Sequence, residues 1–433
     1  GYGKSKVHSK DATQSTDLTQ SAVSSLSGNV NIVAGKDLTA EAAILAAGKD
    51  INLMGKNVHL DAADIQQDTQ SKFESKSSGV SIGFTYSGEA AAAASAKKSQ
   101  ESNDFSDSAV GKIMSSAETA RKATMAATTP VVFQAHNQKT TKTKDTNSTQ
   151  SVGTEVKAGG NLNIIATEGD IRSQGAKISA EGDALLHAKN NVDLLATQNT
   201  ESQTADSKRK GFSIDNRDHI APLGVYNDKE KANGGFVQSV GTELSVGGKT
   251  TIKADDGNIN IVGSKVVSQD DLRMTAGKDI NIQSAQNSFK QDESKKSKGW
   301  GSAQISDTER FDGYMANQNK TSSGSVTQER SQVGSLDGNV NINAGNNYNQ
   351  KVADVVAGKD LNIIAKSINI VDDHNTGSDS QSSKDLKIGL FSRVSSPLID
   401  LVNAVDKAGK SKADDRTQAL QGVAAVAQGY QTY

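Results

Sequence analysis

The sequence contains no cysteine, only 3 prolines in 433 residues, and few aromatic residues, which make up 4% of the chain. The absence of cysteine excludes disulfides, thiolate metal sites and a cysteine nucleophile. So few aromatic side chains leave little material for an ordinary globular core, and the polar composition by itself would fit a disordered chain. No apolar run reaches the roughly 18–20 residues of a membrane-spanning helix, and a net charge of −2 gives no overall attraction to nucleic acid.

Although the composition does not identify a fold, a large internal repeat does. Glycines that precede apolar–polar–apolar triplets recur in pairs 20 residues apart, at Gly28 and Gly48, Gly257 and Gly277, and Gly338 and Gly358. A further block starts at Gly160. Asn or Lys-Asp follows these glycines, and such residues suit turns because a positive φ costs them little.

The apolar residues within each block have the spacing of short strands. In the third block they are Ile252, Ile259, Val266, Leu272 and Ile280, so a strand recurs about every seven residues. Three such strands in roughly 20 residues describe one coil of a three-sided β-helix. Heptad helices share this spacing, but β-branched anchors separated by Gly, Asn and Thr disfavour helix. We therefore predict an all-β chain, a right-handed parallel β-helix with three strands per coil.

Long polar arms separate the blocks, which lie near 28–60, 160–195, 248–284 and 338–370. We predict that the arms are antiparallel β-hairpins protruding from the helix; disordered loops are the alternative on composition alone. Short helices are expected at the tip that begins at Gly88 and in a tail over 391–433, where Pro397 suits a first helical position. The β-helical region is thus predicted over 1–390, with the helical tail leading into a following domain.

The pattern Ala-Gly-Lys-Asp-Leu/Ile, followed by arms rich in Ser and Lys, occurs at 34–38, 47–51, 276–280 and 357–361. It resembles the haemagglutinin repeats of filamentous haemagglutinin-like exoproteins, which include adhesins and contact-dependent growth inhibition proteins secreted by Gram-negative bacteria through two-partner secretion. The resemblance covers essentially 1–390. It implies a secreted protein displayed on the cell surface, and an outer-membrane secretion transporter as a partner of the parent protein. It also implies contact with the outer membrane, or with a surface receptor or glycan, of a target cell. No toxin module is visible, so any toxin role would belong to the parent protein.

The polar residues form no recognisable catalytic, cofactor or metal site. His59 and His187 alternate with apolar residues and are expected to be strand residues on the helix surface. The cluster Asp-Asp-His at 372–374 favours a turn, because a metal site needs several converging ligands. The polar cluster at 215–219 lies at an arm tip, where a solvated turn is favoured over a glycan contact. The phosphate-loop-like stretch 246–251 leads into a strand rather than a helix, so the motif fails.

Basic strings beside aromatic residues are the candidate partner-binding features. Such strings could bind anionic lipid or lipopolysaccharide headgroups, or their lysines could merely prevent edge pairing of exposed arms; the sequence leaves both readings open. The candidate contact residues are Tyr86, Lys208, Arg209, Lys210, Phe212, Lys295, Lys296, Lys298 and Trp300.

Three functions are compatible with these features. The first is an adhesive or delivery filament whose arms contact a target-cell envelope or host surface. The second is a purely structural rod that presents an adhesin or toxin. The third, a glycan-active β-helical enzyme, is disfavoured because no carboxylate pair recurs on adjacent coils. We expect a binding segment without catalytic residues.

Overall fold

The computed structural model describes residues 1–84, 131–215, 223–306 and 309–393. These residues form strands, turns and connecting loops, with no helix among them. The helix expected from Gly88 onward lies outside the described part of the chain, as does the predicted tail from residue 394; residues 391–393, assigned to that tail, belong instead to a strand. None of the described residues belongs to a helix that could span a lipid bilayer.

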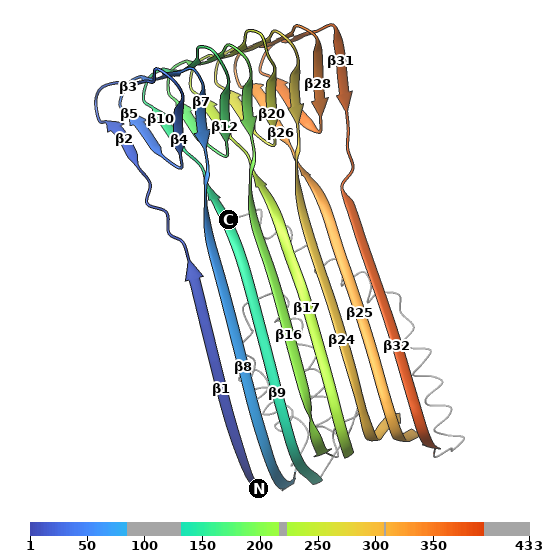
Figure 1. Ribbon diagram of the computed structural model, residues 1–433. Coiled ribbons are helices and arrows are strands. Elements are labelled where there is room, and N and C mark those ends of the chain that lie inside the picture. The colour runs from blue at the N-terminus through green and yellow to red at the C-terminus, as the bar shows by residue number, and fades with distance from the viewer. Residues whose placement is uncertain (85–130, 216–222, 307–308, 394–433) are drawn as a thin grey trace.

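Three parallel sheets, each of eight strands, form the sides of a β-helix (Figure 1). The first sheet contains β2 (Ala22–Ser25), β5 (Ile44–Ala47), β10 (Glu155–Ala158), β13 (Lys177–Ala180), β18 (Glu243–Val246), β21 (Lys265–Ser268), β26 (Ser331–Ser335) and β29 (Ala353–Ala357). The second contains β3 (Val30–Val33), β6 (Ile51–Gly55), β11 (Leu162–Ala166), β14 (Ala184–Ala188), β19 (Thr250–Ala254), β22 (Leu272–Ala276), β27 (Val340–Ala344) and β30 (Leu361–Ile364). The third contains β4 (Leu38–Glu41), β7 (Val58–Asp61), β12 (Ile171–Gln174), β15 (Val192–Leu195), β20 (Ile259–Val262), β23 (Ile280–Gln283), β28 (Asn347–Lys351) and β31 (Ser367–Val371). The predicted parallel β-helix is confirmed.

Identical side-chain positions stack from coil to coil, because each strand pairs in parallel register with the strands before and after it. Along the second sheet, Leu53, Ile164, Leu186, Ile252 and Met274 follow one another directly, and all are fully buried. Burying such a side chain stabilises the fold by about 1.5–3 kcal/mol. The core is therefore a set of apolar ladders that run along the helix axis.

Columns of Asn and Asp side chains fasten the turns of successive coils. Between the second and third sheets, Asn57 Oδ1 accepts from the backbone N–H of Asp170 at 2.8 Å, and Asp170 Oδ1 accepts from that of Asn191 at 2.8 Å. Asn191 and Asn258 continue the column in the same way. A second column between the first and second sheets includes Asp50, Asn161, Asp183, Asp271 and Asn339. The Asp and Asn of the repeated motif thus satisfy backbone donors of the next coil.

The glycines of the motif serve a different purpose from the one expected. Gly48, Gly277 and Gly358 do not have positive φ angles. Instead, a Cβ at any of them would collide with a backbone carbonyl oxygen of the coil before, that of Leu26 in the case of Gly48. Close approach of neighbouring coils, rather than a left-handed turn, requires glycine there.

The corner between the third and first sheets alternates between a tight turn and an arm. The tight turns place Ala42, Gly175, Gly263 and Val352 at equivalent positions, with φ of 46°, 63°, 58° and 48°. At the other passages the chain leaves for an arm, and a buried hydroxyl marks where it returns. Thr242, for example, is fully buried, and its Oγ1 lies 3.0 Å from the carbonyl oxygen of Leu195 and 3.1 Å from that of Ser173.

The arms pair with one another as well as within each hairpin, and so form a single antiparallel sheet of eight strands in sequence order. This arm sheet contains β1 (Tyr2–Ser15), β8 (Ala63–Phe84), β9 (Val131–Val152), β16 (Thr197–Asp215), β17 (Leu223–Val240), β24 (Ala285–Ser306), β25 (Glu309–Glu329) and β32 (Thr376–Arg393). All its strands project from the same side of the β-helix, roughly perpendicular to the helix axis (Figure 1). The predicted protruding hairpins are confirmed, and they are joined edge to edge.

The tight corner at Val352 yields a stability prediction. A left-handed backbone costs a residue with a Cβ roughly 1–2 kcal/mol, whereas glycine adds about 0.5–1 kcal/mol of chain entropy. We expect Val352→Gly to raise the free energy of unfolding modestly in urea titrations followed by circular dichroism. The reverse substitution at the equivalent corner, Gly263→Val, is the control and should lower it, both through the left-handed backbone and because its Cβ would lie 2.5 Å from that of Ala285. Destabilisation by Val352→Gly comparable to that of the control would contradict the strain at this corner.

Candidate functional site: the lysine face of the arm sheet

The two faces of the arm sheet carry different side chains. Successive residues of a strand point to opposite faces, and residues paired directly across strands share a face. The face that carries Lys210 and Lys298 is called the lysine face below. On this face Lys208 and Lys296 are exposed, whereas Arg209 and Ser297 on the other side are half-buried.

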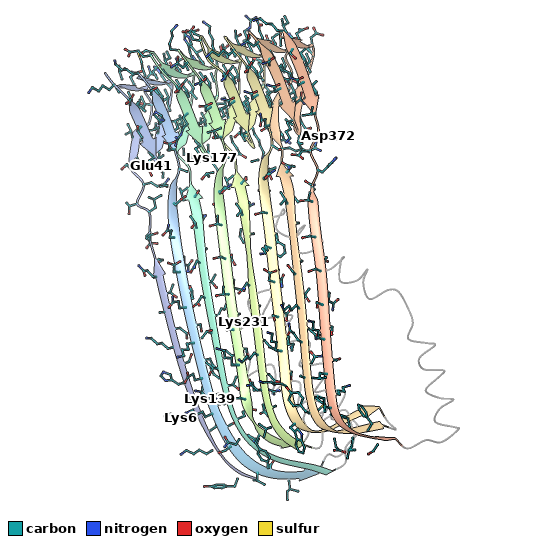
Figure 2. The ribbon with its side chains drawn as sticks, turned by 45° about the vertical axis from the view of Figure 1, so that its right-hand side comes forward. Lys6, Glu41, Lys139, Lys177, Lys231 and Asp372 are labelled. Atoms are coloured by element: carbon teal, nitrogen blue, oxygen red, sulfur yellow. The ribbon has the colours of Figure 1, made fainter. Side chains whose placement is uncertain are left out.

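Lysine is the most frequent residue in two neighbouring rows on the lysine face. The distal row crosses the strands in the order Lys6, Lys76, Lys139, Lys210, Asn227, Lys298, Ala316 and Leu386. The proximal row, two residues closer to the β-helix along each strand, is His8, Glu74, Thr141, Lys208, Lys229, Lys296, Gln318 and Lys384. Lys6 and Lys139 mark the distal row in Figure 2. Like charges directly opposite each other on neighbouring strands destabilise a sheet, so these rows oppose folding rather than assist it.

The lysines of these two rows have no ion-pair partner among the described residues. Ion pairs on this face occur closer to the β-helix or at its margin, as between Lys231 and Asp206 at 3.6 Å and between Lys290 and Asp292 at 3.2 Å. The Ser322 hydroxyl, and after it Lys290, hold the pKa of Asp292 below its usual value. Some lysines nearer the helix, such as Lys231 and Lys290, are thus neutralised, whereas those of the two rows are not.

An apolar row lies next to the distal lysine row, on its far side from the β-helix. It includes Phe212, Val225, Trp300, Tyr314 and Ile388, which are direct neighbours across five strands. Trp300 is 67% exposed and Val225 and Ile388 are each 62% exposed. A continuous exposed row of this kind is unusual for a free surface and is typical of a contact surface.

Two of the basic residues on the opposite face, Arg209 and Lys295, are neutralised by carboxylates. Arg209 contacts Asp228 at 2.8 Å and lies 4.9 Å above the ring of Tyr226. Lys295 forms an ion pair with Glu230 at 2.5 Å. These cations stabilise the sheet and are not available to a partner in the way that Lys210 is.

The structure thus divides the predicted contact residues into two groups. Strand alternation places six of them together on the lysine face, namely Lys208, Lys210, Phe212, Lys296, Lys298 and Trp300. Arg209 and Lys295 lie on the opposite face, so a partner that contacts the lysine face does not reach them. Tyr86 lies outside the described residues.

Sequence reasoning missed the lysines contributed by the other arms, which are Lys6, Lys76, Lys139, Lys229 and Lys384. A signal for some of them was present. Lys76, Lys210 and Lys298 each lie 15 residues after the end of the preceding strand of the third sheet, at β7, β15 and β23. Equal spacing from the coil places them in one row once the arms are known to pair.

The remaining polar candidates have structural roles. His187 points outward from β14 and lies 3.0 Å from Asp255. Asp373 pairs with Lys351 at 2.8 Å and accepts from the backbone N–H of His374, and these contacts, Lys351 first, lower its pKa. Within the described ranges no group of three or more His, Cys, Asp or Glu side chains is placed to hold a metal ion. Thr250 begins strand β19, as expected for the failed phosphate-loop motif. The cluster at 215–219 falls largely outside the described residues.

A known protein family matches this chain along its large repeats. A family model described as "Hemagglutinin repeat" matches residues 1–128, 135–234, 223–310 and 312–429. The chain belongs to the haemagglutinin-repeat family. The predicted resemblance is thereby confirmed, and its four matches reflect the four large repeats of the sequence.

Relatives include long toxin proteins of Gram-negative bacteria. The chain is 25% identical over 378 residues to "tRNA nuclease CdiA" of Escherichia coli (strain NC101), which covers 80% of this chain and 11% of that protein. It is 26% identical over 306 residues to "Toxin CdiA" of Yersinia pestis, covering 66% and 9% respectively. A "Deoxyribonuclease CdiA" of Yersinia pseudotuberculosis is 27% identical over 313 residues, covering 66% and 28%. The chain thus spans about a tenth of the length of the first two. No solved structure matches.

Unpaired like charges make a prediction about stability. Because Lys229 is directly opposite Lys208 and Lys296, Lys229→Gln should stabilise the fold by roughly 0.2–1 kcal/mol at low salt. Lys295→Gln, the matched control on the opposite face, should destabilise it, since Glu230 loses its partner. At low salt the two substitutions should shift the thermal midpoint in opposite directions. In about 1 M salt, where the Debye length is about 3 Å, both midpoints should approach that of the natural chain. If both substitutions lowered the thermal midpoint, Lys229 would not be repelled by Lys208 and Lys296.

Proposed function

We propose that this chain is a contact segment of a large secreted filamentous protein displayed on a Gram-negative cell, and that the lysine face docks onto the anionic envelope of a target cell. The observation that carries this proposal is the separation of charges on the arm sheet. Lysines without partners, such as Lys210 and Lys298, are gathered beside an exposed apolar row, whereas Arg209 and Lys295 on the opposite face are ion-paired.

The chemistry of the lysine face fits an anionic lipid surface. A basic residue near such a surface contributes about 1 kcal/mol of attraction, so two rows of lysine supply several kcal/mol. Trp and Tyr are favoured at membrane interfaces because their rings combine an apolar body with a polar group, and Trp300 and Tyr314 are direct neighbours in the apolar row. Repulsion within the rows is relieved when phosphate or carboxylate groups lie over them.

The family and the relatives support the wider setting of this function. Haemagglutinin repeats cover the chain, and the related CdiA proteins are several times longer. Their printed names describe nucleases and toxins, and we assign no such activity to this chain, which we propose is a binding segment rather than an enzyme. Its further partners would be a secretion transporter for the parent protein and a receptor or glycan on the target cell.

A purely structural spacer is the second candidate, and the β-helix itself favours it. The apolar ladders and the Asn/Asp columns continue through successive coils with little variation, which is what a rod requires. A spacer, however, has no need for unpaired lysines beside exposed aromatic side chains.

Binding to vesicles tests the proposal against the spacer. We expect the chain to co-sediment with vesicles that contain anionic phospholipid and not with neutral ones, and binding should weaken steeply with salt. Replacing Lys6, Lys76, Lys139 and Lys210 with Gln should weaken the partition by up to about a thousandfold, at roughly 1 kcal/mol per lysine. The charge-matched control replaces Lys49, Lys157, Lys177 and Lys249, which lie on the β-helix, and should bind like the natural chain.

The absence of natural cysteine permits a positional readout in the same experiment. An environment-sensitive dye on Trp300→Cys should shift to the blue with anionic vesicles, whereas the same dye on Lys157→Cys should not. No co-sedimentation with anionic vesicles would leave the spacer as the function. An equal loss of vesicle binding in the lysine-face variant and in the control variant would mean that binding depends only on the net charge of the chain.

A further inference from the structure

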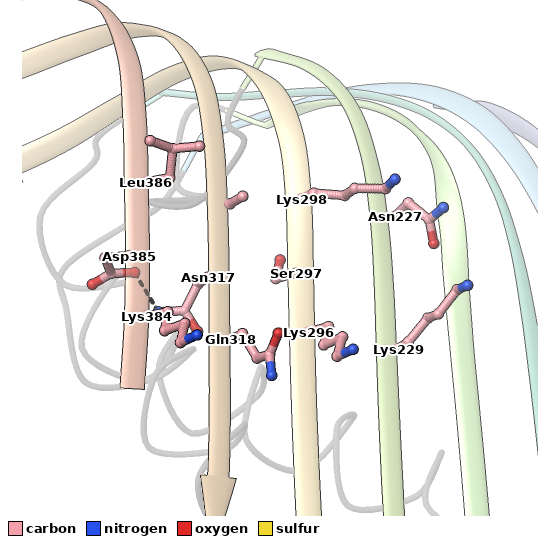
Figure 3. A pocket seen from close by; sticks show the side chains of 11 residues that line it. Asn227, Lys229, Lys296, Ser297, Lys298, Asn317, Gln318, Lys384, Asp385 and Leu386 are labelled. Atoms are coloured by element: carbon pink, nitrogen blue, oxygen red, sulfur yellow. Dashed lines mark hydrogen bonds between the residues drawn. The ribbon is translucent and has the colours of Figure 1, made fainter. Parts of the chain in front are cut away.

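Four lysines of the lysine face surround one shallow groove. The groove has a volume of about 340 Å³ and lies across β17, β24, β25 and β32. Lys229, Lys296, Lys298 and Lys384 line it together with Ala316, and Leu386 lies at one side (Figure 3). This volume is at the lower end of the range of small-molecule sites.

The side chains directed into the groove supply positive charge and amide groups but no carboxylate. Strand alternation places Asn227 and Gln318 on the same face as the lysines, between them in the two rows. The intervening residues point to the opposite face, where the Asn317 amide donates to Asp385 and the Ser297 hydroxyl donates to Asp228. The only acidic group in the lining is therefore engaged on the other side of the sheet.

The neighbouring rows over these four strands add no negative charge on this face. The row nearer the β-helix is Lys231, Ser294, Lys320 and Ser382, and the row nearer the tips is Val225, Trp300, Tyr314 and Ile388. Four amino groups without an ion-pair partner among the described residues thus share one concave surface. A compact anion of high charge bound between them would relieve their mutual repulsion.

We propose that this groove binds a phosphomonoester carried on a lipid headgroup. A phosphomonoester has a charge of about −1.5 to −2 at neutral pH and three acceptor oxygens, which suits several converging ammonium groups. A carboxylate, with one negative charge and two acceptor oxygens, would neutralise fewer of these ammonium groups. Leu386 and the apolar row beyond the groove match the hydrocarbon that accompanies a lipid phosphate.

This inference rests on the proposed function and narrows it to one ligand chemistry. The test compares two kinds of vesicle in which neutral lipid is mixed with an anionic lipid, either phosphatidic acid, a phosphomonoester, or phosphatidylglycerol, a phosphodiester, in proportions that give equal surface charge. The whole chain should bind the phosphatidic acid vesicles about tenfold more tightly, the effect of one additional strong charge-assisted contact.

Two triple variants with equal loss of charge locate the preference. Lys229→Gln/Lys296→Gln/Lys384→Gln should abolish the tenfold preference and retain part of the binding to both vesicles. Lys6→Gln/Lys76→Gln/Lys139→Gln, on the same face but outside the groove, should weaken both kinds of binding equally and keep the preference. Circular dichroism checks that both variants remain folded.

Each of the other possible results contradicts one part of the proposal. Equal binding of the two vesicles by the natural chain, or loss of preference in both variants, would refute the groove while leaving the anionic docking surface in place. Absence of binding to either vesicle would refute the docking function itself. If inorganic phosphate alone removes the preference at micromolar concentration, the groove is a site for soluble phosphate and the assignment to lipid is wrong.

Discussion

The in-register stacking of one coil on the next is the constraint on which the rest of this molecule depends. Backbone hydrogen bonds between parallel strands require every coil to follow nearly the same path. Gly48 and its equivalents allow the turns to approach closely, and the Asp and Asn columns supply acceptors for the exposed turn amides. Because the path is fixed, the chain leaves for an arm at the same corner in every repeat.

The arm sheet follows from that regularity. Arms that start at the same corner, on coils stacked one above another, have their backbones at strand spacing and pair without further adjustment. The equal distance from the coil to Lys76, Lys210 and Lys298 then sets both the row and the face of each side chain. A shift by one residue in an arm would move its lysine to the opposite face. The position of a lysine along its arm therefore matters as much for the lysine face as the presence of the lysine itself.

Much of the fold could be read from the sequence, and less of the site. The apolar triplets and the repeated Gly-Lys-Asp predicted the coils, because these features are local and recur. The same residues led to a wrong reason for glycine, since close approach at Gly277 depends on a residue of the preceding coil, Asp255, that local sequence does not reveal. The contact site was predicted from two strings, but their residues separate by strand parity, and Lys139 and Lys384 join them only through pairing between arms.

A protein whose arms all leave from one corner has two unlike long edges, one formed by the β-helix and one by the arm tips. Lengthening the molecule by a repeat adds a hairpin to the tip edge and no new kind of contact. In the docking proposed above, each hairpin would bind the target surface weakly. Because a bound hairpin holds its neighbours at high local concentration, several hairpins together would bind tightly. In that docking, detachment requires every bound hairpin to release, so the time on a surface would rise with the number of repeats as well as with the affinity of each hairpin.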